Sequence, residues 1–126
     1  MKKIFLVMMC TLFGTLFGCS GQNRFRSVDV ERFARVIERE EVQLVDVRTP
    51  EEYAEGHIEG AVNMDVKGDA FDAQLSTLDP KRPVALYCRG GRRSKAAAER
   101  AAKAGFKVFE LDKGYLSWEA HYGEQQ

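Results

Sequence analysis

The chemistry of this chain is concentrated in residues 87–94, which read Tyr-Cys-Arg-Gly-Gly-Arg-Arg-Ser. A cysteine thiolate is a nucleophile, and adjacent glycines let successive backbone N–H groups turn toward a bound anion. No acidic residue occurs between Val84 and Ala98, whereas four basic residues do: Arg89, Arg92, Arg93 and Lys95. The segment therefore predicts a loop that holds the Cys88 thiolate in an anion-binding cradle.

The elements on either side of this loop would place Cys88 at a helix N-terminus. Residues 83–87 form a short apolar run of strand type, and residues 94–103 form an alanine-rich helix closed by Gly105. A free cysteine has a pKa of about 8.5, which helix N-termini and cationic neighbours lower to roughly 3.5–7.5. We therefore expect Cys88 to be largely thiolate at neutral pH. The alternative is that Cys88 is a small, inert core residue.

The rest of the chain alternates between helical and extended patterns. Asp29 is expected to cap the first helix, and Thr49, Pro50 and Glu52 form the start of another, with a capping box. The other expected elements are strands at 42–47, 61–64 and 107–111 and helices at 71–78 and 115–121. This alternation predicts an α/β fold whose mostly parallel sheet has helices on both faces and sites at the carboxyl ends of its strands.

The first eighteen residues have the pattern of an export signal. Lys2 and Lys3 precede an apolar stretch from Ile4 to Phe17, and residues 16–19 read Leu-Phe-Gly-Cys. This pattern resembles the lipobox of bacterial lipoproteins, which implies that Cys19 is lipidated and begins the mature chain. Residues 19–24 would then be a lipidated tether. The resemblance implies a membrane-anchored protein in the bacterial cell envelope that faces the periplasm, and Ser20 favours the outer membrane in a Gram-negative host.

The cysteine count and the charge balance exclude several classes of protein. Cys10 would leave with the signal and Cys19 would carry lipid, so Cys88 would be the only mature thiol, without an internal disulfide. His57 and His121 lack metal-ligand spacing relative to Cys88, and we expect neither a metal nor another cofactor. The 19 basic and 19 acidic side chains balance, which argues against binding to nucleic acid.

Two segments together resemble the rhodanese-like (sulfurtransferase) domain family. One covers residues 44–63, with Asp46-Val47-Arg48-Thr49-Pro50 followed by Gly56-His57-Ile58, and the other is the loop 88–94. The resemblance implies one domain over residues 25–122, followed by a tail at 123–126, with a five-stranded sheet. It also implies that Cys88 carries sulfane sulfur as a persulfide, held by the loop residues Arg89, Gly90, Gly91, Arg92, Arg93 and Ser94.

The family resemblance leaves three functions open. The first is sulfur transfer from thiosulfate or a persulfide donor to a thiol or cyanide, with a thioredoxin-like protein as a candidate reductant of Cys88. The second is a non-catalytic module that binds an anion or senses redox state. The third is a phosphatase or arsenate reductase, but the loop of those relatives has five residues between cysteine and arginine. Only four separate Cys88 from Arg93 here, which favours sulfur transfer.

Asp46 and Arg48 follow a predicted strand and are expected to support the same rim. Asp46 would accept hydrogen bonds from backbone N–H groups, and Arg48 would pair with a carboxylate such as Glu52 or Glu55. The family pattern implies that Arg93 braces the loop.

Arg89 and Arg92 would face solvent and attract an anionic donor, and the alternative is that both are merely solvated charges. His57 would be a structural hydrogen-bonding residue, and Tyr115 and Trp118 would pack in the core or at the pocket rim. The family commonly has two glycines before the last helix, where this chain has Lys113 and Gly114. Lys113 would add a cation near the entrance if this segment borders the site.

Overall fold

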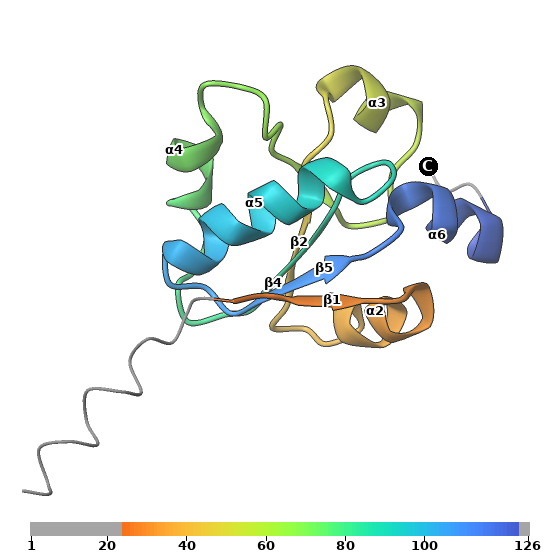
Figure 1. Cartoon of the computed structure of the whole chain (residues 1–126), viewed down its shortest axis with the longest axis horizontal. Coiled ribbons are helices and arrows are strands. Elements are labelled where there is room, and N and C mark those ends of the chain that lie inside the picture. Colours follow the sequence, from red (N-terminus) through yellow and green to blue (C-terminus); the bar gives the residue numbers. More distant parts are fainter. Residues whose placement is uncertain (1–23, 124–126) are drawn as a thin grey trace, which may run out of the picture.

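A computed structural model describes residues 24–123, which form a five-stranded sheet with the order β1-β5-β4-β2-β3. All four strand pairs are parallel, which confirms the predicted α/β architecture. The strands are β1 (Arg26–Val28), β2 (Gln43–Asp46), β3 (Val62–Asn63), β4 (Val84–Tyr87) and β5 (Val108–Leu111). β4 lies in the middle of the sheet (Figure 1), so Cys88 follows the carboxyl end of the central strand.

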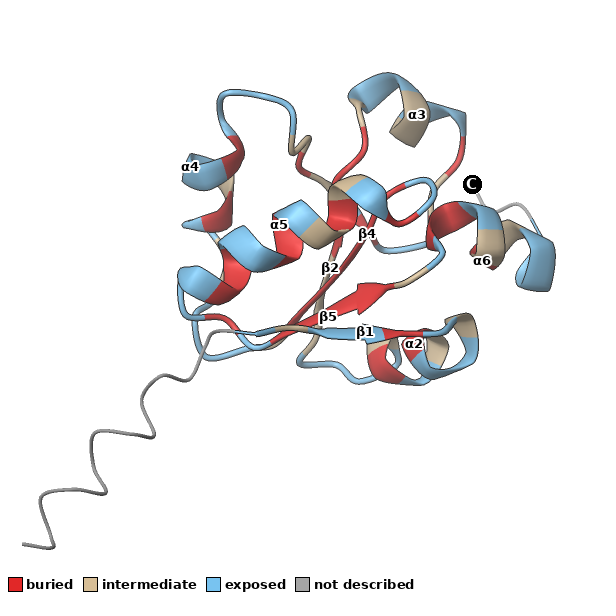
Figure 2. Ribbon diagram, in the orientation of Figure 1, coloured by how far each residue is buried: buried red, intermediate tan, exposed pale blue. Residues whose placement is uncertain are grey.

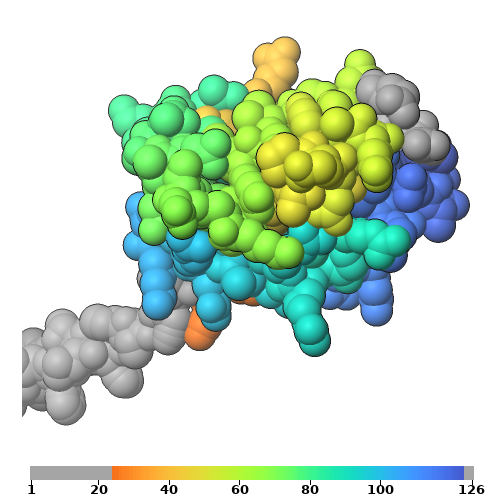
Figure 3. All heavy atoms as spheres, turned by 90° about the horizontal axis from the view of Figure 1, so that it is seen from above, coloured from red at the N-terminus to blue at the C-terminus, as the bar shows by residue number. Residues whose placement is uncertain are grey.

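Helices cover both faces of the sheet, as predicted. They are α2 (Val30–Ile37), α3 (Pro50–Glu55), α4 (Phe71–Leu75), α5 (Arg92–Lys103) and α6 (Gly114–Tyr122). One core cluster joins the sheet to α4 and α5, and a second joins it to α2 and α6. Figure 2 shows the buried stripes of α5 and α2 facing the sheet from opposite sides. In the space-filling view from above, α3, α4, α5 and their connections form one continuous surface of the molecule (Figure 3).

The predicted helix starts are present. The Asp29 side chain caps α2 by accepting a hydrogen bond of 2.9 Å from the Arg32 N–H. Thr49 and Glu52 form the capping box of α3, and Pro50 occupies its first position. Both caps satisfy N–H groups that have no partner inside the helix. These short motifs depend on neighbouring residues alone, which is why sequence locates them correctly.

The structure differs from the prediction in three elements. β1 was not expected, because its only buried residue is Val28 and the strand pairs at the edge of the sheet. α5 begins at Arg92 rather than Ser94, since Gly91 turns the chain with a φ of 105°. α4 ends at Leu75 rather than at residue 78. The hydroxyls of Ser76 and Thr77 donate to the carbonyls at the end of that helix and close it early.

The predicted signal (1–18) and the predicted lipid site Cys19 lie outside the described residues, as do most of the tether and the last three residues of the tail. Within residues 24–123, no helix combines the length and the apolar character needed to cross a membrane.

Tyr87 connects the central strand to the segment that follows α3. Its ring is fully buried, and its hydroxyl donates to Asp46 Oδ2 at 2.9 Å while accepting from the Ile58 N–H at 3.0 Å. Burial, reinforced by the charge of Asp46, raises the pKa of Tyr87. The side chain therefore stays a neutral phenol that can both donate and accept.

Replacing Tyr87 with phenylalanine should lower the free energy of unfolding by about 1–3 kcal/mol, because the Ile58 N–H loses its partner in a buried place. Urea denaturation of the wild type and Tyr87→Phe measures this change. Tyr122→Phe is the matched control, since Tyr122 is 43% exposed and its change should have little effect. Equal destabilisation by the two substitutions would contradict this role of Tyr87.

Candidate active site

Cys88 directly follows β4 and lies at the N-terminal end of α5. Cys88 is 1% exposed, and its Sγ accepts a hydrogen bond of 3.1 Å from the Gly91 N–H. Sγ also lies 3.3 Å from Ser94 Oγ, which belongs to the first turn of α5. The positive end of the helix dipole and the Gly91 N–H both favour negative charge on this sulfur. The arrangement is able to hold a thiolate.

Backbone contact with the turn between β5 and α6 fixes the shape of this loop. The Tyr115 N–H donates to the Cys88 carbonyl at 2.8 Å, and the Leu116 N–H donates to the Arg89 carbonyl at 3.1 Å. A Cβ at Gly91 would lie 2.0 Å from the Asp112 carbonyl oxygen, and one at Gly114 would lie 2.3 Å from the Arg89 carbonyl oxygen. Both glycines also have positive φ angles. The close approach therefore requires glycine at these two places.

Arg93 pairs with α3. Its guanidinium makes two hydrogen bonds to the carboxylate of Glu52, at 2.8 and 3.0 Å. The hydrogen bond from Arg93, helped by the Thr49 N–H, lowers the pKa of Glu52 to about 2 despite partial burial. The same pair raises the pKa of Arg93. Arg93 therefore connects the Cys88 loop to α3.

The other cations of the loop divide into paired and exposed groups. Lys95 Nζ lies 2.9 Å from Asp112 and 3.2 Å from Glu110. Arg89 and Arg92 are exposed, and neither makes an ion pair with any residue in the range 24–123. Of the predicted anion-binding cations, only these two remain available to a ligand.

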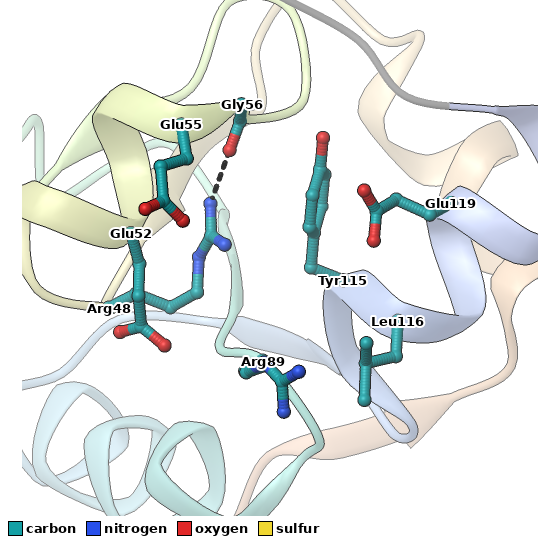
Figure 4. A pocket seen from close by; sticks show the side chains of 8 residues that line it. All are labelled: Arg48, Glu52, Glu55, Gly56, Arg89, Tyr115, Leu116 and Glu119. Atoms are coloured by element: carbon teal, nitrogen blue, oxygen red, sulfur yellow. Dashed lines mark hydrogen bonds between the residues drawn. The ribbon is translucent and has the colours of Figure 1, made fainter.

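A pocket opens beside the loop, between α3 and α6 (Figure 4). Arg89 lies at its base, with the Arg48 side chain on one side and the Tyr115 ring on the other. Three carboxylates also line it, so the surroundings of Arg89 carry both signs of charge. The lining residues are Arg48, Glu52, Glu55, Gly56, Arg89, Tyr115, Leu116 and Glu119.

Asp46 and Arg48 form a buried ion pair under this pocket. Arg48 Nη2 lies 2.7 Å from Asp46 Oδ2 and donates to the Gly56 carbonyl at 2.7 Å. Asp46 also accepts a hydrogen bond from the Arg48 N–H, as expected. Arg48 pairs with a carboxylate, as expected, but its partner is Asp46 rather than Glu52 or Glu55. Glu52 pairs with Arg93 instead. Burial lowers the pKa of Arg48, but the hydrogen bond to Asp46 outweighs it and raises the pKa.

The aromatic residues support the Arg48 side chain. The guanidinium carbon lies 4.5 Å from the centre of the Tyr115 ring, a cation–π contact.

Trp118 and His57 make contacts elsewhere in the fold. Trp118 is buried and packs edge-on against Phe33. His57 Nδ1 lies 2.9 Å from the Tyr53 carbonyl, and its ring stacks on that of Tyr53. These contacts are structural, and His57 does not line the pocket.

Lys113 is exposed and is not among the residues that line the pocket. Its neighbour Gly114 does border the loop, through the close contact with Arg89. The segment therefore borders the loop through its backbone, whereas the Lys113 side chain does not line the pocket.

Sequence reasoning overlooked the buried Glu110, which contacts Ser94 Oγ at 2.5 Å. The available signal was a charged residue inside the apolar run of β5, whose four positions are all buried. A buried carboxylate needs several hydrogen-bond donors, but these come from distant parts of the chain. Within residues 24–123, no group of three or more histidine, cysteine or acidic side chains is arranged to hold a metal ion.

Comparisons with known proteins agree with this fold. The family model for the rhodanese-like domain matches residues 29–121. The thiosulfate sulfurtransferase GlpE of Pseudoalteromonas translucida is 28% identical over 102 residues, which cover 80% of this chain and 95% of that protein. A sulfurtransferase of Allochromatium vinosum is 34% identical over 88 residues, covering 69% and 80%.

A solved structure extends the comparison to three dimensions. A rhodanese-related protein from Thermoplasma volcanium superposes with a TM-score of 0.70 at 24% identity, covering 78% of this chain and 94% of that one. This likeness supports the fold.

Glu52→Gln should lower the free energy of unfolding by about 1 kcal/mol at neutral pH, because solvent screens a pair whose side chains are 23% and 26% exposed. The folded pKa of Glu52 is about 2, below its ordinary 4.5, so the pair stabilises the fold above pH 4.5 and loses its effect as the pH falls toward 2. Denaturation across this pH window should show a shallower acid dependence in Glu52→Gln. Glu59→Gln, at an exposed position, is the control, and an acid dependence identical to wild type in Glu52→Gln would contradict the assignment.

Proposed function

This chain belongs to the rhodanese-like domain family, and we propose that its sulfurtransferase activity moves sulfane sulfur from thiosulfate or a persulfide donor to a thiol acceptor through a persulfide on Cys88. The observation that carries the proposal is the position of Cys88 Sγ and the hydrogen bond that it accepts. The sulfur lies at the N-terminus of α5 and accepts a hydrogen bond from the Gly91 N–H, while Arg93, near the end of the loop, is paired with Glu52.

In the first half-reaction, the Cys88 thiolate attacks the outer sulfur of the donor. A new S–S bond forms, and the donor's own S–S bond breaks with its electron pair on the leaving group. With thiosulfate, the leaving group is sulfite. The Gly91 N–H and the dipole of α5 stabilise the negative charge of the resulting persulfide.

In the second half-reaction, an acceptor thiolate attacks the outer sulfur of the persulfide. The bond between the two sulfurs breaks, Cys88 leaves as a thiolate, and the acceptor leaves as a new persulfide. Cyanide can replace the thiol and yields thiocyanate. The exposed Arg89 at the base of the pocket is placed to attract an anionic donor.

The geometry of Arg93 favours sulfur transfer over phosphatase or arsenate reductase activity. A tetrahedral oxyanion needs a cation that binds its developing charge. Two nitrogens of the Arg93 guanidinium, Nη1 and Nη2, are already committed to the carboxylate of Glu52. The four-residue spacing from Cys88 and this outward pairing together leave a cradle suited to a single sulfur.

The purified protein should form thiocyanate from thiosulfate and cyanide, and its Cys88 peptide should gain the mass of one sulfur after incubation with thiosulfate alone. Cys88→Ser should abolish both signals, because the hydroxyl cannot form the persulfide. A colorimetric thiocyanate assay and mass spectrometry measure these outcomes.

Two results would replace this proposal with another function. Hydrolysis of an aryl phosphate that requires Cys88, without thiocyanate formation, would indicate a phosphatase. Binding of an anion or a partner that is unchanged in Cys88→Ser, without sulfur turnover, would indicate a non-catalytic module. Retention of both sulfur signals by Cys88→Ser would remove the proposed nucleophile.

We also propose that the chain is lipid-anchored through Cys19 and faces the periplasm, where a thioredoxin-like protein could keep Cys88 reduced. The supporting observation is the run of Lys2, Lys3 and an apolar stretch before Gly18 and Cys19. A lipid at Cys19 would hold the domain at the membrane surface by the short tether of residues 19–24.

Cys19→Ala should release the protein from the membrane fraction or block its maturation, because the lipid attachment atom is lost. Fractionation of cells with an immunoblot measures the distribution, and mass spectrometry of the isolated protein reports the lipid. Cys10→Ala is the control, and it should leave the distribution unchanged. Membrane association of Cys19→Ala equal to the wild type, with no lipid on either protein, would contradict the anchor.

A further inference from the structure

Glu110 is a fully buried acidic residue that the proposed sulfur transfer does not use. It lies in β5 with an exposure of 0%. The Ser27 hydroxyl donates to its Oε1 at 2.6 Å, the Ser94 hydroxyl donates to its Oε2 at 2.5 Å, and Lys95 Nζ lies 3.2 Å from Oε2. Burying a carboxylate is costly even when donors surround it, so its position next to the Cys88 loop invites a functional explanation.

Ser94 joins this carboxylate to the nucleophile. Its hydroxyl oxygen lies 2.5 Å from Glu110 Oε2 and 3.3 Å from Cys88 Sγ. A serine hydroxyl has one proton and two lone pairs, and the shorter contact places that proton toward Glu110. Ser94 therefore presents a lone pair to Cys88, which suits a thiol that donates its proton. A thiolate in the same arrangement would face a lone pair.

We propose that Glu110 is a positioning residue that controls the protonation of Cys88 through Ser94. When Cys88 becomes a thiolate, its S–H bond breaks with the electron pair on sulfur, and the proton passes to Ser94 Oγ. At the same time the original Ser94 proton passes to Glu110 Oε2. The Ser94 hydroxyl then donates to the thiolate and the Glu110 carboxyl donates to Ser94, so both contacts remain hydrogen bonds in both states. The inference rests on the proposed role of Cys88 as the nucleophile.

Charged groups lie beside both ends of this path. Lys95 on α5 contacts both Glu110 and Asp112, and Asp112 follows β5. Burial lowers the pKa of Lys95, but hydrogen bonds to Asp112 and Glu110 outweigh it and raise the pKa. When Glu110 is protonated, Asp112 still pairs with Lys95. On the other side, the charge of Arg93 also acts on Cys88, but its guanidinium is paired with Glu52.

The path makes Cys88 and Glu110 a coupled pair that shares one proton. One tautomer of the singly protonated pair carries the thiolate, and its fraction does not depend on pH. Alkylation of Cys88 should therefore show an acidic plateau, meaning a reactivity that persists below neutral pH, before a second rise at higher pH. A carboxylate that acts only through space gives the opposite effect, because its negative charge repels a thiolate.

The test is the pH profile of the iodoacetamide reaction in the full-length protein, followed by mass spectrometry of the peptide that contains Cys88. Glu110→Gln keeps the shape of the side chain but cannot accept the proton. We expect it to lose the acidic plateau, with a rate at least about tenfold below wild type in mildly acidic buffer, equivalent to one pH unit of titration. A profile that is unchanged, or shifted to faster reaction at acidic pH, would overturn the proposal.

Two further variants keep the test decisive if Glu110→Gln does not fold. Ser94→Ala leaves the carboxylate in place but opens the path, so it should lose the same plateau, and a retained plateau would overturn the proposal. Asp72→Asn is the control. It removes an exposed carboxylate that pairs with Arg100 and contacts no group on the path, so its profile should keep the plateau, and loss of the plateau would overturn the proposal.

Alkylation reports on the Cys88 thiol alone and requires no sulfur donor. A chain that transfers no sulfur but shows the predicted profiles would keep this inference and lose the proposed function. Normal sulfur transfer by the wild type, together with an alkylation profile of Glu110→Gln that equals the wild-type profile, would keep the proposed function and overturn this inference.

Discussion

The site depends on direct backbone contact between the Cys88 loop and the turn that starts α6. The Cys88 and Arg89 carbonyls accept N–H groups from that turn, and Gly91 and Gly114 have no room for a side chain. Because β4 and β5 are neighbouring parallel strands, their carboxyl ends bring these two segments to the same edge of the sheet. The contact fixes Gly91 as the last residue before α5, which in turn aims its N–H at the sulfur and places Ser94 in the first turn of the helix.

The fold balances most of the positive charge around the sulfur. Arg93 pairs with Glu52, Lys95 with Glu110 and Asp112, and Arg48 with Asp46. A guanidinium that is paired with a carboxylate attracts a further anion weakly, because the two charges largely cancel at a distance. The local field at Sγ therefore comes mainly from the Gly91 N–H and the N-terminus of α5. Such a field suits one negatively charged sulfur better than a doubly charged oxyanion.

Sequence predicted the elements that local patterns control. The capping box of α3, the Asp29 cap and the position of Cys88 after a central strand all follow from neighbouring residues. The partners of the charged side chains could not be predicted in this way. The absence of acids between Val84 and Ala98 indicated an uncompensated cluster, yet Glu52 and Glu110 reach it from other elements. β1 escaped detection for the same reason, because pairing with β5 rather than its own pattern makes it a strand.

Two polar networks flank Cys88, and they differ in whether a proton can move. In the network of Asp46, Arg48 and Tyr87, the guanidinium and the phenol both have raised pKa values, so their protons stay in place across the physiological range. That network holds the rim of the pocket rigid. In the network of Ser94 and Glu110, a hydroxyl bridges a thiol and a carboxylate, two groups that can exchange a proton without exposing an unpaired charge. The network of Asp46, Arg48 and Tyr87 thus holds the pocket residues in position, while the network of Ser94 and Glu110 exchanges a proton with the sulfur. A step that changes the charge on the sulfur therefore does not require the pocket residues to move.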